Sequence, residues 1–389
     1  MLKENKENKK ILNILIVVTR GVVGGAQKSV FELASALRRD GHKVVVGYGD
    51  GDFLKEECDK DNILTKKFKH LSRSHNVFSI FLFIFEIRKF INKNNFDVVH
   101  LNSSNALLAV FAIKSLKKEK RPKIVFTFRG LSFLDEKSYG SKIVKYFYRL
   151  VFKFLTKFVD ENVFVSRSNY DFAIRKQIVS AGTVIYNGIN FKKNVFINKE
   201  LAREEISKKI KKNLDGYFII GSIGRLSYAK NYEFLINQMP FIIKNFPNTK
   251  TIIIGGGNEE KKYKRLINNL NLNNHVFLFG ELKNASRYIK AFDLFVLPSR
   301  YEGFSVTVIE SLCAGIPLLI SNVGGAKEQL DHSLEQLYDL DNEIDFRIKF
   351  SKLIANIQKL NYLSDLNFKK SFYYDIEETK NNYIKIFNN

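Results

Sequence analysis

The chain has 389 residues, of which 45% are hydrophobic and 26% charged, and its formal net charge is +23. This length exceeds what one hydrophobic core usually serves, so it favours two domains, and the composition argues against a disordered chain. The only cysteines, Cys58 and Cys313, are far apart, which excludes a disulfide framework and a Cys-based zinc site and favours a reducing cytoplasm. The positive charge attracts polyanions such as nucleic acid, anionic lipid or phosphorylated substrates, unless it reflects only a Lys-rich solvated surface.

The first apolar run, 11–18, is too short to span a membrane and has no small-residue cleavage site after it. It therefore predicts a buried strand. From there apolar runs of strand length alternate with amphipathic runs of helix length, which is typical of parallel sheets with crossover helices. In the first half we expect a helix over 26–39 and strands at 11–18, 43–48, 97–101, 123–128, 162–165 and 183–186.

A polar, Lys-rich stretch at 192–212 interrupts the alternation and predicts an interdomain boundary. The second half resumes with strands expected at 217–221, 250–255, 275–279, 293–297 and 317–320. The predicted parts of the chain are an N-terminal domain (1–195), a C-terminal domain (196–370) and a last helix (371–389) that packs back on the N-terminal domain. Ligands of doubly wound α/β sheets bind beyond the carboxyl ends of the strands, so the loops there are candidate sites.

The first expected strand is followed by Gly24 and Gly25, just before a helix. Paired glycines let a ligand approach the free N–H groups of a helix N-terminus, although such a pair is also an ordinary tight turn. The G-x-G-x-x-G spacing and the acidic residue after the second strand are missing, so a NAD-dependent enzyme is disfavoured.

Two cations, Arg225 and Lys230, lie in the loop after the strand expected at 217–221. A guanidinium offers bidentate contact to phosphate and an ammonium offers a point charge, so the two are suited to hold a diphosphate. The alternative is a pair of solvated loop cations.

The segment after the strand expected at 293–297 carries two carboxylates eight residues apart, Glu302 and Glu310. If Ser305 or Val306 opens a helix, the first carboxylate precedes it and the second lies inside it, so both can face one crevice. The helix start would then bind an anion, which the helix dipole favours. The backbone N–H groups expected to point at that anion belong to Phe304, Ser305 and Val306.

The segment 298–328 resembles the donor site of the retaining glycosyltransferases of family 4, the group 1 enzymes with the GT-B fold. The resemblance spans nearly the whole chain and includes the Gly224 loop, Tyr186-Asn187-Gly188-Ile189 and Gly24-Gly25-Ala26-Gln27. It implies an α/β GT-B fold, with two doubly wound Rossmann-like domains facing across a cleft. It also implies transfer of a sugar, with retention, from a nucleotide-sugar (a UDP-sugar favoured) to a hydroxyl of a glycan or lipid-diphosphate-linked acceptor, in cell-surface polysaccharide or glycolipid synthesis.

The resemblance also implies roles for single residues. Glu302 would hold a hydroxyl of the transferred sugar, Glu310 the ribose hydroxyls, and Arg225 and Lys230 the diphosphate. The other donor-binding candidates are Gly224, Leu282, Gly303, Phe304, Ser305 and Val306, and those on the acceptor or phosphate side are Gly24, Gly25, Gln27, His100 and Arg129. The nucleotide-sugar is a substrate, and we expect neither a cofactor nor a metal.

Two departures from the family pattern fall in the first domain. Arg129 stands where many members carry a His that touches the donor sugar. Asn102 replaces the second His of a frequent His-x-His pair, of which His100 is the first. A His that ends a buried strand is more often structural, so we do not expect His100 to be a catalytic base. The charge and position of Arg129 suggest instead that it binds an acceptor diphosphate.

Basic residues at steps of three and four in the segment 138–158 predict an amphipathic helix, and a second, more apolar helix is expected over 77–90. Such helices lie on anionic membranes or serve as ordinary crossover helices. We expect a cytoplasmic protein that can attach to the inner face of the cytoplasmic membrane and does not bind nucleic acid. The competing hypotheses are a nucleotide-sugar epimerase or phosphorolytic enzyme on the same fold, and a basic membrane- or nucleic-acid-binding module without catalysis.

Overall fold

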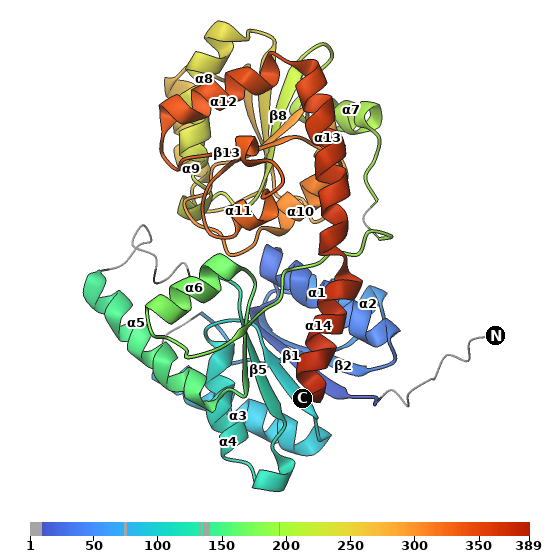
Figure 1. Cartoon of the computed structure of the whole chain (residues 1–389), viewed down its shortest axis with the longest axis vertical. Coiled ribbons are helices and arrows are strands. Elements are labelled where there is room, and N and C mark those ends of the chain that lie inside the picture. Colours follow the sequence, from blue (N-terminus) through green and yellow to red (C-terminus); the bar gives the residue numbers. More distant parts are fainter. Residues whose placement is uncertain (1–9, 74–75, 132–133, 135–140, 194) are drawn as a thin grey trace, which may run out of the picture.

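The computed structural model describes residues 10–73, 76–131, 134, 141–193 and 195–389. They form two parallel sheets, which lie in the lower and upper halves of Figure 1. The strand order is β3-β2-β1-β4-β5-β6-β7 in the N-terminal sheet and β10-β9-β8-β11-β12-β13 in the C-terminal sheet. The order reverses beside β1 and β8, so both domains have the doubly wound arrangement that the sequence predicts.

The N-terminal domain has a hydrophobic cluster on each face of its sheet. In the central strand β1, six consecutive residues are buried, because helices cover both faces and leave neither side of the strand for water. The strands are β1 (Asn13–Arg20), β2 (Lys43–Asp50), β3 (Leu64–Lys67), β4 (Val98–Leu101), β5 (Lys123–Phe128), β6 (Glu161–Phe164) and β7 (Thr183–Val184). The helices are α1 (Gly25–Arg39), α2 (Phe53–Lys60), α3 (Val77–Asn94), α4 (Ala109–Lys114), α5 (Lys142–Leu155) and α6 (Arg167–Arg175).

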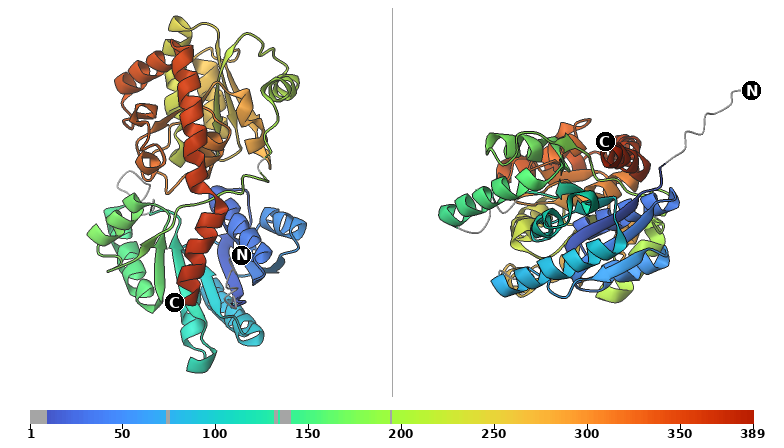
Figure 2. Two further views of the ribbon diagram at one scale, coloured as in Figure 1. Left: turned by 45° about the vertical axis from the view of Figure 1, so that its right-hand side comes forward. Right: turned by 90° about the horizontal axis from the view of Figure 1, so that it is seen from below.

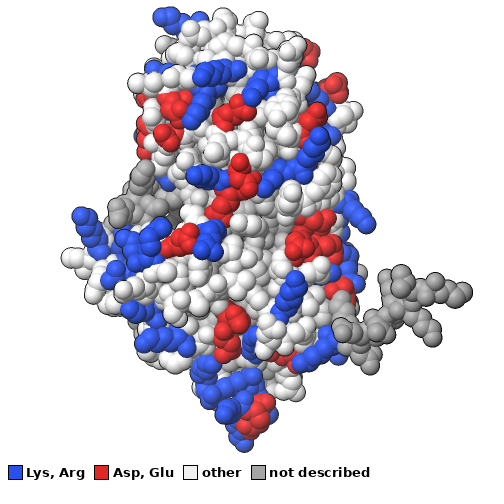
Figure 3. Space-filling model, in the orientation of Figure 1, with Lys and Arg blue, Asp and Glu red and all other residues white. Residues whose placement is uncertain are grey.

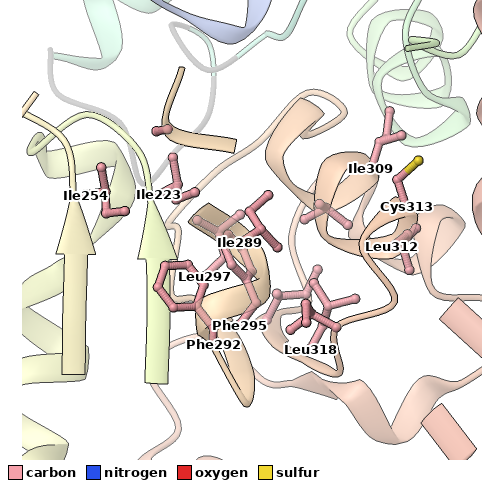
Figure 4. Close-up of a cluster of buried hydrophobic side chains, with 14 of the residues drawn as sticks. Ile223, Ile254, Ile289, Phe292, Phe295, Leu297, Ile309, Leu312, Cys313 and Leu318 are labelled. Carbon is pink, nitrogen blue, oxygen red and sulfur yellow. The ribbon is translucent and has the colours of Figure 1, made fainter. Parts of the chain in front are cut away.

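The C-terminal domain repeats this layout. Its strands are β8 (Phe218–Ile223), β9 (Thr249–Ile254), β10 (Val276–Gly280), β11 (Leu294–Leu297), β12 (Leu318–Ser321) and β13 (Leu337–Tyr338). Its helices are α7 (Lys199–Ile210), α8 (Tyr232–Asn245), α9 (Glu260–Asn269), α10 (Val306–Cys313), α11 (Ala326–Gln329), α12 (Glu343–Ile354) and α13 (Ile357–Ser371). Figure 4 shows part of one core cluster, to which Ile309 and Leu312 of α10 contribute together with Phe295 of β11 and Leu318 of β12. α10 is therefore anchored in the core of this domain.

The last helix, α14 (Ile376–Asn388), lies on the N-terminal domain. Figure 2 shows α13 and α14 following one another from the upper domain to the lower one. Tyr383, Ile386 and Phe387 are buried in the same cluster as Ile14, Ile16 and Val18 of β1. The returning chain also exchanges backbone hydrogen bonds with the outgoing linker, since Ile189 N donates to the Tyr374 oxygen and Ile376 N to the Ile189 oxygen. The two chain segments that cross between the domains are therefore hydrogen-bonded to each other.

Two short strands were missed from the sequence. β3 was missed because it is a short edge strand whose Leu64 is 72% exposed, and β13 because it has only two residues. The polar stretch 192–212 contains α7, whose buried Ala202 and Ile206 pack in the C-terminal core, so most of it belongs to that domain. The helix expected from 138 begins at Lys142, and 138–140 lie outside the described residues.

Candidate active site

A cavity of about 390 Å³ lies between the two domains, at the carboxyl ends of both sheets. It brings together residues that the sequence places more than 280 positions apart. The predicted site residues that line it are Gly24, Gly25, Gln27, Arg129, Gly224, Arg225, Lys230, Leu282, Glu302, Gly303, Phe304, Ser305 and Val306. Glu310 and His100 do not line it.

The two predicted diphosphate ligands reach the cavity from the loop after β8. Lys230 ends a short 3-10 turn, and its Nζ lies 2.5 Å from Oε1 of Glu302, which also accepts a hydrogen bond from Ser299 at 2.7 Å. Arg225 Nη2 donates to the Val23 oxygen of the other domain at 3.3 Å. Burial and the nearby Arg20 lower the pKa of Arg225, but a guanidinium stays protonated in proteins. Two cations and one carboxylate thus face the same space.

The N-terminus of α10 closes one wall of the cavity. Val306 opens the helix, as predicted, and among the described residues neither a capping side chain nor an acidic first-turn residue compensates its free N–H groups. An anion in the cavity would therefore meet the positive end of a helix. Gly303, just before this turn, touches the opposite domain so closely that a Cβ there would lie 2.2 Å from the Arg129 oxygen.

Glu310 lies behind this wall, on α10, and is 3% exposed. Its Oε1 accepts a hydrogen bond from Lys28 Nζ of α1 at 2.8 Å, and its Oε2 has no hydrogen-bond partner among the described residues. Glu310 lines a second cavity of about 260 Å³, and Lys28 and Lys283 line both cavities. Glu310 is therefore beside the main cavity and is already paired with a cation of the other domain.

His100 does not line the cavity and is fully buried. Its Nε2 is 2.7 Å from Thr127 Oγ1, and its ring packs on Tyr383 of α14 at a centroid distance of 4.8 Å. Burial and the charge of Arg129 hold the pKa of His100 well below its usual value, so the imidazole is neutral. The structure thus places His100 among core contacts that anchor α14.

Comparison with known proteins gives the family. The model of "Glycosyl transferases group 1" matches residues 202–363, and the model of "Glycosyltransferase Family 4" matches residues 23–193. The chain is a group 1, family 4 glycosyltransferase. It is 29% identical over 276 residues (69% of this chain, 66% of the relative) to an uncharacterised glycosyltransferase of Methanocaldococcus jannaschii. It is 27% identical over 290 residues (72% of each chain) to the Escherichia coli UDP-Gal:alpha-D-GlcNAc-diphosphoundecaprenol alpha-1,3-galactosyltransferase.

Among solved structures, Anabaena HepE in complex with UDP and glucose superposes with a TM-score of 0.82 at 19% identity, covering 97% of this chain and 99% of that one. The fold is GT-B. No helix within the described ranges is long and apolar enough to cross a membrane.

Several residues that line the cavities of this glycosyltransferase, or contact residues that do, were missed from the sequence. Lys28 pairs with Glu310, Ser299 holds Glu302, and Lys283 forms an ion pair with Glu56 of α2 at 2.5 Å. Ser299 could have been found, since it lies in the motif three residues before Glu302. The interdomain ion pairs could not, because they depend on how the two domains dock. Leu282 both lines the cavity and packs on the C-terminal core.

Proposed function

We propose that this glycosyltransferase transfers a sugar from a UDP-sugar to a hydroxyl of a glycan or lipid-diphosphate-linked acceptor, with retained anomeric configuration. The observation that carries the proposal is the convergence of Arg225, Lys230 and Glu302 with the start of α10 in one interdomain cavity. The E. coli relative, whose name specifies a UDP-sugar donor and a diphosphoundecaprenol acceptor, supports the same substrate classes.

The residues of the cavity have complementary tasks in such a transfer. Arg225, Lys230 and the N–H groups of α10 offset the negative charge that grows on the departing diphosphate, and they are in place before the reaction begins. Glu302 orients the transferred sugar through a hydroxyl. The departing diphosphate itself helps to deprotonate the incoming hydroxyl. Gly24, Gly25 and Gln27 face the donor wall from the other domain, where the acceptor or its phosphates would approach.

The test starts with thermal-shift screening against UDP-, GDP- and ADP-sugars, because a ligand that binds only the folded state raises the melting temperature. With the donor identified, Arg225→Ala and Lys230→Ala are each expected to lower turnover about 10²- to 10³-fold. The exposed Lys262 of α9, which does not line the cavity, provides the matched control Lys262→Ala. If the two site variants together change turnover less than tenfold, their assigned roles are wrong, and an inverted product anomer in NMR would refute retention.

The competing reactions have distinct outcomes. A nucleotide-sugar epimerase or a phosphorolytic enzyme would form product without an acceptor, whereas a transferase requires one. A basic binding module without catalysis would show no saturable binding of a nucleotide-sugar. We expect such binding, and expect Glu310→Ala to weaken it, because the buried carboxylate is placed beside the cavity.

We also propose that the N-terminal domain attaches to an anionic membrane through α3 and α5. Large apolar side chains of both helices face solvent, with Phe78 73% and Ile143 81% exposed. Phe111 of α4 is close to Phe154 of α5, at a centroid distance of 6.5 Å, so the apolar surface continues between the helices. Lys and Arg line the lower left edge of Figure 3, where Figure 1 shows α5. Exposed apolar rings flanked by cations fit an interface rich in acidic lipid headgroups.

Sedimentation with vesicles containing acidic phospholipid tests this attachment. We expect binding that weakens as salt rises, and loss of binding in the double variant Ile143→Ser/Phe147→Ser. The matched control is Ile344→Ser on α12, whose side chain is 70% exposed in the other domain. Wild-type protein that stays in the supernatant at low salt would reject the proposal.

A further inference from the structure

Arg129 and Asn102, the two residues that depart from the family pattern in the N-terminal domain, are hydrogen-bonded to each other. Arg129 donates to the amide oxygen of Asn102 from Nε at 3.1 Å and from Nη2 at 2.6 Å. Its Nη1 donates to the amide oxygen of Asn187 at 2.6 Å. Both asparagines are buried, so they hold the guanidinium at two fixed points. A lysine could not reproduce this planar set of bonds.

Asn187 links the Arg129 guanidinium to the other domain. Its Nδ2 donates to the backbone oxygen of Phe304 at 2.9 Å, directly before the donor-binding turn of α10. An amide side chain has one accepting and one donating end. Because Arg129 occupies the oxygen, the nitrogen of Asn187 must face Phe304. Arg129 thus determines the orientation of the side chain that holds the donor turn.

The guanidinium is not retained for an ion pair. Among the described residues no carboxylate contacts it, and burial lowers its pKa without removing its charge. A partly buried cation held only by neutral amides is costly compared with an apolar group of similar size. Three of the five N–H groups are already engaged with Asn102 and Asn187, which favours a role through these partners over direct capture of the acceptor.

We propose that Arg129 is a positioning residue for sugar transfer: through Asn187 it fixes the Phe304 carbonyl, and with it the donor-binding turn, against the acceptor-side domain. The inference rests on the proposed function, in which donor and acceptor are held by different domains. A displacement of about 1 Å between reacting groups can lower a rate about 100-fold. Asn102 and Arg129 act as one unit in which each replacement accommodates the other.

Steady-state kinetics of Arg129→Lys, Asn187→Ser and the double variant test the inference. Each single variant is expected to lower kcat about 10- to 100-fold, with the KM of donor and acceptor within about threefold of wild type, because neither residue needs to touch substrate. The double variant should be no slower than the worse single variant, since both changes break the same chain of bonds. Arg121→Lys, in the same domain but away from the cleft, is the matched control.

Other results would overturn the proposal. An acceptor KM that rises while kcat is kept would mean that Arg129 binds the acceptor directly. Additive losses in the double variant would mean that the two residues act separately. A lower melting temperature with unchanged kcat per folded molecule would mean a purely structural role. A wild-type chain without transferase activity would refute the proposed function instead. The hydrogen-bond network would then be tested by the crystal structure of Arg129→Lys. We expect the Asn187–Phe304 hydrogen bond to be lost in that structure, and its persistence would overturn the proposal.

Discussion

The ion pair between Lys28 and Glu310 joins the two domains at their interface, beside the main cavity. The variant Lys28→Met tests how much this pair contributes to the free energy of unfolding. At 2.8 Å the Coulomb attraction is about 6 kcal/mol for an effective dielectric constant of about 20. Most of this attraction offsets the cost of taking the charges out of water, which is several kcal/mol per ion. Glu310 is only 3% exposed, so without Lys28 its charge stays buried and uncompensated. We expect Lys28→Met to lower the free energy of unfolding by about 3 to 5 kcal/mol.

The assay is urea-induced unfolding followed by circular dichroism, since the chain contains no Trp. The matched control is Lys28→Met/Glu310→Gln, which removes both charges and should recover most of the lost stability. Glu310→Gln alone should cost less than Lys28→Met, because Lys28 is 22% exposed and can turn its ammonium into water. A cost below about 1 kcal/mol for Lys28→Met, or no recovery in the double variant, would refute the reasoning.

Two further predictions concern the same interface between the domains. Burial raises the pKa of Glu32 to about 7, so the folded protein keeps a proton that the unfolded chain releases near its ordinary pKa of about 4.3. Stability should therefore fall as pH rises from about 4.5 to 7, by at most about 1.4 kcal/mol per pH unit, and Glu32→Gln should flatten this dependence in urea titrations at pH 5 and 8. If Glu32→Gln left the pH dependence of stability unchanged, this prediction would be contradicted. Gly303→Ala should cost about 1 to 3 kcal/mol, because its Cβ would collide with the Arg129 oxygen. Gly25→Ala, whose Cβ would meet Val306 at an ordinary 3.6 Å, should cost less in the same unfolding assay.

The strands and the donor motif could be predicted from the sequence because their signals are local. An apolar run such as 123–128 indicates a buried parallel strand without knowledge of its neighbours, and β5 has those bounds. The start of α10 could likewise be predicted from the residues around Val306. The edge strand β3 could not, because half of it faces water and its Lys66 and Lys67 hide the pattern.

The contacts between the domains could not be predicted, although they shape the cavity between the domains. Nothing in the sequence indicates that Lys28 reaches Glu310 or that Asn187 reaches Phe304, since each pair is more than 100 residues apart and meets only when the domains dock. His100 illustrates the same limit. Its neutral state depends on the burial that α14 provides from the far end of the chain.

Arg129 and Asn102 lie at the junction between the two domains. Arg129 is separated from the donor turn by a single amide, and a side chain at Gly303 would strike its backbone. We therefore expect a substitution in one domain at this junction to affect the other domain as well. Within the N-terminal domain, Asn102 is a hydrogen-bond partner of Arg129. Asn102→His should consequently impair this enzyme less than Arg129→His, because only the second change removes the hydrogen bond to Asn187. Equal activity of these two variants would contradict this prediction.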